Sequence, residues 1–224
     1  MTSIDAFPSE GRFHAGLGMW VRAPGAPLAS PRPALFLDRD GVIVEDPGYL
    51  SRGADVILIP GAAEVIGLAN RRAVPVIVVT NQSGIGRGYY GWDQFLEVED
   101  ALAGELGRAG AVIDAVFACP YHRDGVGPWA HPAHPARKPR PAMLLAAKRF
   151  LNIDLENSWI VGDQRGDLLA GYNAGLRGGL HVLTGQGAKH RQAVLTWRPA
   201  EFEVRVGDSI RDAVDLLESL APAR

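Results

Sequence analysis

Residues 34–41 read Ala-Leu-Phe-Leu-Asp-Arg-Asp-Gly. Four apolar residues predict a buried strand that runs directly into Asp38, and Asp40 follows two places later. Side chains at i and i+2 of an extended segment share a side, so we expect both carboxylates in one space at the carboxyl end of the strand. Two like charges that close repel unless a cation or a proton lies between them. Hard oxygen ligands without a soft one favour magnesium.

The same stretch has an alternative interpretation, in which a strand simply ends in a polar turn. We favour the functional interpretation because Asp-x-Asp-Gly after a buried-type strand offers two chemical roles at once. One carboxylate can attack a phosphorus atom, and the other can handle the proton of the leaving group.

Composition limits the class of protein. The chain has 224 residues, of which 47% are apolar and 21% charged, as in ordinary globular domains. A net charge of −2 offers no basic surface for nucleic acid, and no apolar run or charged leader indicates a membrane segment. The single cysteine, Cys119, cannot form an intrachain disulfide. We expect a cytoplasmic monomer without nucleic-acid or membrane partners.

Strand-like and helix-like segments alternate after residue 33, which predicts an α/β fold with a doubly wound, mostly parallel sheet and helices on both faces. Expected strands are 34–37, 74–80, 112–118, 158–161, 179–184 and 202–206. Expected helices are 61–72, 93–109, 142–150, 167–174 and 209–220. Residues 1–33 are dense in Gly and Pro and predict an extended N-terminal arm, packed on the body through Phe13 and Trp20. Residues 34–224 form the one predicted domain.

Ligands of such sheets bind beyond the carboxyl ends of the strands, so the polar residues there are candidates for a site. The second strand ends in Thr-Asn-Gln-Ser-Gly-Ile-Gly-Arg-Gly (80–88), which is either a phosphate-binding loop or a glycine-rich turn. The fourth ends in Gly-Asp-Gln-Arg-Gly-Asp (162–167), where Asp163 is the candidate ligand and Asp167 its support or a first-turn helix acid. Lys138 precedes a Pro-x-Pro segment, in a solvated loop or bridging the nucleophile and a phosphate.

In this order, the four motifs resemble those of the haloacid dehalogenase superfamily of phosphatases. The sequence is most similar to the branch that holds D-glycero-D-manno-heptose-1,7-bisphosphate 7-phosphatase and histidinol-phosphate phosphatase. The motifs of that branch present here are Phe-Leu-Asp-Arg-Asp-Gly, Asp-Pro-Gly-Tyr (46–49), the Thr-Asn-Gln-Ser-Gly-Ile-Gly-Arg-Gly loop and Arg-Lys-Pro-x-Pro. The resemblance covers residues 33–185 and implies a Rossmann-like core.

The resemblance implies that Asp38 is the nucleophile, forming an aspartyl-phosphate, and that Asp40 is the acid and then the base. Thr80 and Lys138 would hold the phosphoryl group. Mg²⁺ would be bound by Asp38, the backbone carbonyl of Asp40, and Asp163. Residues implied in substrate contact are Asp46, Gly48, Tyr49, Asn81, Gln82, Ser83 and Arg137.

The expected activity is hydrolysis of a sugar phosphate ester, with D-glycero-D-manno-heptose 1,7-bisphosphate cleaved at C7. Histidinol phosphate is the alternative substrate. A non-catalytic phosphate-binding or receiver-like regulatory module is an alternative of another class. The presence of nucleophile, acid and lysine argues against that class.

Spacing predicts an open site. Only 41 residues lie between Asp38 and Thr80, and 57 between Thr80 and Lys138. Strands and helices occupy most of both segments, which leaves no room for a separate cap domain.

The chain departs from the family pattern in two places. Members of the family usually carry a zinc loop, but Tyr121, His134 and Ala136 replace three of its four ligands. A shifted set of Cys119, His122, His131 and His134 could bind zinc, but we favour a proline-rich loop that packs without metal. The second departure is Gln164, at a position where the family commonly has a Lys or Arg. Arg165 could supply the missing cation for a second substrate phosphate.

Overall fold

The centre of the fold is the strand predicted from residues 34–37. The computed structural model describes residues 11–23, 26–197 and 199–221, and it places this strand, β3 (Leu35–Leu37), fully buried. β3 pairs in parallel with β4 (Val76–Asn81) on one side and with β6 (Trp159–Gly162) on the other. The chain therefore moves outward from β3 in both directions, which creates a switch point at its carboxyl end.

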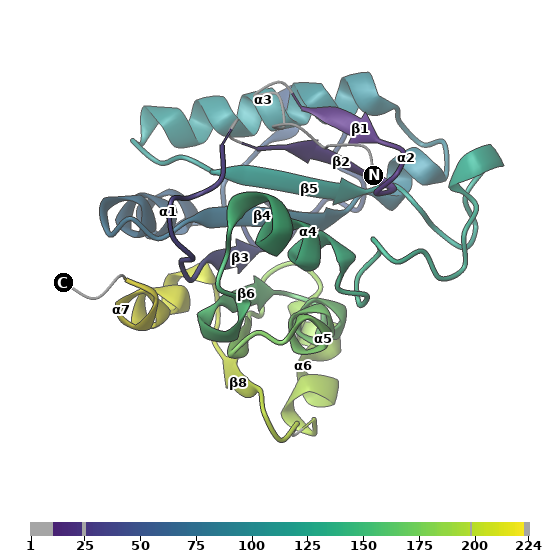
Figure 1. Ribbon diagram of the computed structural model, residues 1–224. Coiled ribbons are helices and arrows are strands. Elements are labelled where there is room, and N and C mark those ends of the chain that lie inside the picture. The colour runs from purple at the N-terminus through teal and green to yellow at the C-terminus, as the bar shows by residue number, and fades with distance from the viewer. Residues whose placement is uncertain (1–10, 24–25, 198, 222–224) are drawn as a thin grey trace.

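The sheet of the described residues has eight strands in the order β1-β2-β5-β4-β3-β6-β7-β8 (Figure 1). The remaining strands are β1 (Arg12–His14), β2 (Met19–Arg22), β5 (Ala115–Cys119), β7 (Gly178–His181) and β8 (Glu203–Val206). The strands from β5 to β8 run parallel, whereas β2 runs antiparallel to both of its neighbours, β1 and β5. The predicted α/β class with a mostly parallel sheet is confirmed.

Helices cover both faces because side chains alternate along each strand. Leu35 and Leu37 pack on one face, and Phe36 packs on the other. The first face is covered by α1 (Ala62–Arg71), α3 (Trp92–Arg108), the 3-10 turn Ile210–Leu216 and α7 (Leu217–Leu220). The second is covered by α4 (Ala142–Leu151), α5 (Arg165–Ala174) and α6 (Gly187–Leu195). None of the helices described here is long and apolar enough to cross a bilayer.

Three local features differ from the sequence-based expectations. Helix α6 was not expected, since it buries only Gly187 and Val194 and so lacks an apolar stripe. The short helix α2 (Ser83–Gly86) lies within the segment expected to be a loop. The last predicted helix is mostly a 3-10 turn, and only its final residues are α-helical.

The described part of residues 1–33 is more than a packed arm. Strands β1 and β2 form a hairpin, and β2 pairs with the edge of β5, so the sheet crosses the boundary predicted at residue 33. Phe13 and Trp20 pack as expected. The Trp20 ring is buried and meets Phe95 of α3 edge-on at 5.1 Å between centroids. The hairpin thereby protects a sheet edge and caps the core beside α3.

Segments between the central strands are short. In the described chain, the stretch from β3 to β4 holds only α1 and a 3-10 turn, Gly53–Asp55, and the stretch from β5 to β6 holds α4 and two such turns, Gly127–Trp129 and Leu155–Asn157. These described segments contain no separate cap, as the spacing predicted, and the carboxyl ends of β3, β4 and β6 stay open.

Because the hairpin shares the core, Trp20→Ala should destabilise the whole protein by about 3–5 kcal/mol, the cost typical of emptying a buried aromatic site. Urea unfolding followed by circular dichroism measures this. Val112→Ala, at a side chain 58% exposed, is the control and should change stability by less than about 0.5 kcal/mol. A loss as small as the control's would show that the hairpin is not part of the cooperative unit.

Candidate active site

A cleft of about 590 Å³ opens at the carboxyl ends of β3 and β4 and beside the start of α5. Most residues that the sequence singled out line this cleft. They are Asp38, Asp40, Asp46, Gly48, Tyr49, Thr80, Asn81, Gln82, Ser83, Arg137 and Lys138. Asp163 lies behind the wall and is fully buried. Residues from four segments that are distant in the sequence thus meet in one cleft at the carboxyl ends of the strands.

Lys138 is the centre of the site. Its ammonium donates to Asp38 Oδ1 at 2.8 Å and to the carbonyl of Val79 at 2.8 Å, and it pairs with Asp167 Oδ1 at 2.7 Å. Asn81, at the end of β4, holds the lysine's backbone through both its amide nitrogen and its oxygen, at 3.2 and 3.1 Å. The loop that carries Lys138, with its cis Lys138–Pro139 bond, is therefore fastened to the sheet.

Three buried carboxylates converge beside this lysine. Oxygen atoms of Asp38, Asp163 and Asp167 lie within 4.8 Å of one another. Asp163 Oδ2 accepts from the backbone N–H of Gln186 at 2.7 Å, but its buried Oδ1 has no hydrogen-bond partner among the described residues. Three acids around one lysine leave an excess of negative charge that a divalent cation would neutralise.

Burial is the main cause of the raised pKa values of Asp38 and Asp163. It raises the pKa of Asp38 to about 7, although Lys138 opposes the shift. Burial, together with the charges of Asp38 and Asp167, raises the pKa of Asp163 to about 8. For Lys138, burial acts to lower the pKa, but Asp167 and Asp38 outweigh it and the pKa is raised. The ammonium therefore stays charged.

Two glycines make room for Asp163. Gly41 (φ +85°) and Gly185 (φ +59°) both have the left-handed conformation that side chains disfavour. A Cβ at either position would lie within 2.5 Å of Asp163 Oδ2. The left-handed backbone at Gly41 and Gly185 thus lets the two segments meet over a buried carboxylate.

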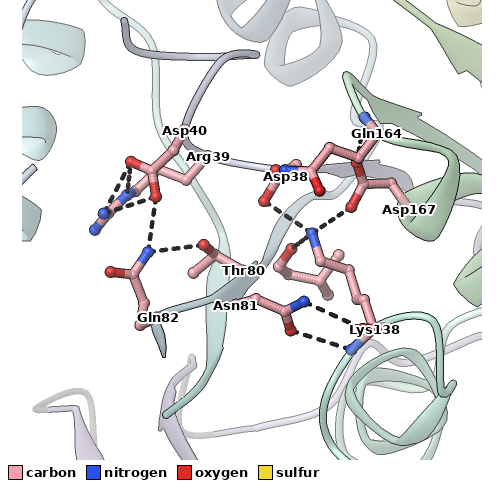
Figure 2. A network of polar contacts seen from close by, with 10 residues as sticks. Asp38, Arg39, Asp40, Thr80, Asn81, Gln82, Lys138, Gln164 and Asp167 are labelled. Carbon is pink, nitrogen blue, oxygen red and sulfur yellow. Dashed lines mark hydrogen bonds and ion pairs between the residues drawn. The ribbon is translucent and has the colours of Figure 1, made fainter. Parts of the chain in front are cut away.

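The two carboxylates of the Asp-x-Asp motif have separate partners, although both line the cleft (Figure 2). Asp38 turns to Lys138, whereas Asp40 turns to Arg39 and Gln82. Arg39 reaches both oxygens of Asp40 at 3.0 Å each, and Gln82 donates to Oδ2 at 2.8 Å. The side-chain alternation of a strand correctly predicted that both carboxylates lie at the cleft. It did not predict that they have different hydrogen-bond partners.

Gln82 lines the cleft, but its polar atoms are engaged by protein groups. Its side chain is buried, and its amide nitrogen donates to Asp40 and also to Thr80 Oγ1 at 2.8 Å. The hydroxyl of Tyr90 donates to its oxygen at 2.5 Å. These partners engage both polar atoms of the Gln82 amide.

The loop 46–49 forms one lip of the cleft. Asp46 accepts from the backbone of Gly48 at 2.8 Å and from the side chain of Gln186 at 3.3 Å. Tyr49 is 42% exposed, accepts from Arg87 at 2.8 Å, and meets the ring of Tyr89 edge-on. This side of the cleft is therefore polar, apart from the aromatic rings of Tyr49 and Tyr89.

Arg137 also lines the cleft. Its guanidinium donates to the carbonyl of Tyr121 at 3.1 Å, and among the ion pairs of the described residues it has no carboxylate partner. Burial lowers its pKa, yet the group remains a cation at neutral pH. An unpaired, half-buried cation in a cleft is suited to bind an anionic group.

The set considered for zinc does not converge. Within the described residues, the Asp38 cluster is the one group of three or more His, Cys, Asp or Glu close enough to hold an ion. Burial raises the pKa of the Cys119 thiol to about 11. The Nδ1 atoms of His122, His131 and His134 each accept a backbone hydrogen bond at 3.1 Å.

Aromatic packing holds this loop instead. The His134 ring stacks on Tyr121 at 3.7 Å, and Tyr121 meets Trp129 edge-on at 5.4 Å. Trp129 in turn packs against Phe13 of the N-terminal hairpin at 5.1 Å. A Cβ on Gly18, in the turn of that hairpin, would overlap the His134 ring, so the glycine permits the contact.

Sequence reasoning missed several residues of the cleft wall. Gln186 and His190 belong to the unexpected α6 region, and Tyr90 follows the glycine-rich loop. Gln164 lines the cleft, whereas Arg165 lies over the ring of Trp197 at 5.8 Å and is not part of the lining. The available signal was the polar segment after β7, since the ends of all parallel strands share one edge.

Comparisons with known proteins agree with this geometry. A family model described as HAD-hydrolase-like matches residues 135–213. D-glycero-beta-D-manno-heptose-1,7-bisphosphate 7-phosphatase of Mesorhizobium japonicum is 45% identical over 192 residues, which are 85% of this chain and 87% of the relative.

Two solved structures are similar. The crystal structure of a HAD-like phosphatase from Mesorhizobium loti has a TM-score of 0.83 and 40% identity, covering 94% of this chain and 98% of that one. That of D,D-heptose 1,7-bisphosphate phosphatase from B. bronchiseptica, complexed with magnesium and phosphate, has a TM-score of 0.71 and 29% identity, covering 83% and 98%.

The raised pKa values predict that the protein loses stability with rising pH when no metal is present. The folded state holds protons on Asp163 and Asp38 that the unfolded chain releases above pH 4, so their contribution disappears as pH rises through about 7 and 8. In buffer with chelator, the free energy of unfolding should fall by about 3–4 kcal/mol from pH 6 to pH 8. Urea unfolding at each pH measures it.

Asp163→Asn is the matched variant, because the amide keeps the shape and cannot ionise. Its free energy of unfolding should change less between the two pH values than that of the wild type. Equal changes in both proteins would contradict the assignment of the proton to Asp163.

Proposed function

This chain belongs to the haloacid dehalogenase (HAD) phosphatases, in the branch of the heptose-bisphosphate 7-phosphatases, and on that premise we propose that it removes the C7 phosphate of D-glycero-D-manno-heptose 1,7-bisphosphate with Mg²⁺ as cofactor. The resemblance inferred from the four motifs is thereby confirmed, and the protein is an enzyme, a phosphoric monoester hydrolase. The residue roles and the substrate that follow are proposals.

One observation carries the proposal. Lys138 joins Asp38 and Asp167 at 2.8 and 2.7 Å beside a third, buried carboxylate whose Oδ1 has no partner. A nucleophile, a cation for the phosphoryl oxygens and a buried carboxylate that can bind a metal thus occur within one small volume. Phosphoryl transfer depends on such positioning and charge neutralisation.

Mg²⁺ fits the carboxylate cluster. Asp38 and Asp163 would bind it together with the backbone carbonyl of Asp40, and Asp167 would support the site through Lys138. The donor set is oxygen only, which suits a hard cation. The orphaned Oδ1 of Asp163 is the group that a cation would satisfy. When bound, the ion supplies positive charge against the phosphate and keeps Asp38 ionised.

In the first step, an oxygen of Asp38 attacks phosphorus, and the bond from phosphorus to the sugar oxygen breaks. Protonated Asp40 gives its proton to that sugar oxygen, so the product leaves as an alcohol. Lys138 and Thr80 hold oxygens of the transferring group. Thr80 accepts its hydrogen bond from Gln82, which leaves the hydroxyl proton of Thr80 to be donated to the phosphate.

In the second step, Asp40 is ionised and takes a proton from water as the water oxygen attacks the aspartyl-phosphate. The bond between Asp38 and phosphorus breaks, phosphate is released, and both carboxylates return to their starting forms. Asp40 lines the cleft together with Asp38, so one group can serve in both steps.

The cleft suits a sugar bisphosphate. It is open, and its rim offers Asp46 and Tyr49 for hydroxyl groups. Arg137, which has no carboxylate partner in the described part of the chain, is a cation for a second phosphate. The relatives named for heptose bisphosphate support this choice of substrate. Histidinol phosphate, which has one phosphate, would leave Arg137 without an anion.

Asp38→Asn should lower phosphate release by at least about a thousand-fold, because the amide cannot form the phosphoenzyme. A phosphate-release assay with Mg²⁺ measures this. Chelator should stop the wild-type reaction, and added Mg²⁺ should restore it. Activity retained in Asp38→Asn would refute the nucleophile. A stable phosphoprotein without release in the wild type would favour a receiver-like module.

A panel of substrates tests the heptose assignment. The wild type should hydrolyse heptose 1,7-bisphosphate, tried as both anomers, with higher kcat/KM than histidinol phosphate or sugar monophosphates. Arg137→Met should raise KM for the bisphosphate about ten-fold or more and change KM for the monophosphates by less than about two-fold, since only the bisphosphate offers a second anion. Equal, low rates on all substrates would remove the heptose assignment while leaving the phosphatase.

A further inference from the structure

The carboxylate of Asp40 is held on both sides by protein groups rather than left free in the cleft (Figure 2). We propose that Arg39 and Gln82 form a clamp that positions Asp40 for proton transfer, and that Glu99 and Tyr90 hold the clamp from behind. The inference rests on the proposed function, in which Asp40 is the acid and then the base. All four residues act through Asp40 and are positioning residues.

Arg39 is the first half of the clamp. Its Nε and Nη2 atoms donate to the two oxygens of Asp40 at 3.0 Å each, a bidentate geometry that fixes the plane of the carboxylate. The third nitrogen, Nη1, donates to Glu99 at 3.1 Å. Arg39 is 1% exposed, and the two acids outweigh the effect of burial, so its pKa is raised.

Glu99 makes this arrangement rigid. It lies on α3, is fully buried, and pairs with Arg39 at 3.1 Å and with Arg22 of the hairpin at 3.3 Å. The ring of Phe95, one helical turn earlier, lies 5.5 Å from the guanidinium of Arg39. A buried ion pair is seldom more stabilising than an apolar pair of the same volume. The network is therefore better explained by the orientation it gives Asp40 than by stability.

Gln82 is the second half of the clamp. Its nitrogen donates at 2.8 Å to both Asp40 and Thr80, and its oxygen accepts from Tyr90 at 2.5 Å. A reversed amide would place its oxygen against the Asp40 carboxylate, so one orientation is favoured. Burial raises the pKa of Tyr90, which keeps its hydroxyl protonated as the donor.

The clamp leaves Asp40 one direction in which to act. Its side chain is 23% exposed, and it lines the cleft that receives the substrate. With Arg39 and Gln82 behind it, the carboxylate can exchange a proton only with a group in that cleft. Small displacements of a positioned catalytic group cost large factors in rate, so the clamp should matter for the proton-transfer step.

Substrates with different leaving groups distinguish a role in positioning Asp40 from a purely structural role. A sugar alcohol needs a proton to leave, whereas p-nitrophenolate does not. The ratio kcat/KM reports the steps up to formation of the aspartyl-phosphate, so the later role of Asp40 as a base does not affect it. A clamp defect should therefore lower kcat/KM for a sugar phosphate and spare p-nitrophenyl phosphate.

The test compares Arg39→Lys and Tyr90→Phe with the wild type on p-nitrophenyl phosphate and on the best sugar phosphate of the panel. Lysine cannot make the bidentate contact, and phenylalanine removes the hydroxyl that holds Gln82. Each variant should lose about ten-fold or more in kcat/KM for the sugar phosphate and less than about two-fold for the aryl ester. Tyr90→Phe keeps the ring, so it tests the clamp if Arg39→Lys does not fold.

Asp114→Asn is the control for a general loss of stability. Asp114 accepts from the backbone of Val76 at 2.8 Å, at the end of the sheet opposite the cleft. It should leave the ratio between the two substrates unchanged. Equal losses on both esters in the clamp variants, or no loss, would overturn the clamp and leave the phosphatase standing. A wild-type protein that cleaves neither ester would overturn both proposals.

Discussion

The contact of Lys138 with Asp38 and Asp167, at 2.8 and 2.7 Å, is the interaction on which the site depends. It links the end of β3, the segment before α4 and the first turn of α5. Three buried acids would repel one another without it, and one lysine does not balance them. The remaining negative charge suits this edge of the sheet to the divalent cation of the proposed function.

This arrangement sets stability against function. Burial raises the pKa of Asp163 to about 8, which favours a proton on this carboxyl group, whereas the proposed function needs the group ionised as a metal ligand. Gly41 and Gly185 approach each other closely over the same carboxylate, which leaves no space for a side chain at either position. Functional sites commonly hold such unfavourable groups, and the surrounding sheet and helices stabilise the fold against them.

The N-terminal hairpin connects the periphery to this centre by two routes. Through Arg22 it reaches Glu99, the residue behind the clamp on Asp40. Through Phe13 it reaches Trp129 and the stacked rings of the loop that carries Arg137 and Lys138. Packing of aromatic rings, with geometry that fixes their angles, gives this loop its order in the described structure. A segment that looked like an extended arm is thus part of the support of the site.

The sequence by itself determined the class of fold and the place of the site. Alternating strands and helices require a parallel sheet, and the ends of its strands share an edge, so Asp38, Thr80 and Asp163 had to come together. The tertiary structure alone decided the partners. Periodicity predicts on which side of a strand a side chain lies, but not which groups that side chain contacts. The hydrogen bond from Gln82 to Asp40 could therefore not be predicted from the sequence. The pairing of Arg39 with Glu99 joins residues 60 positions apart, and no local pattern reports a contact over that distance.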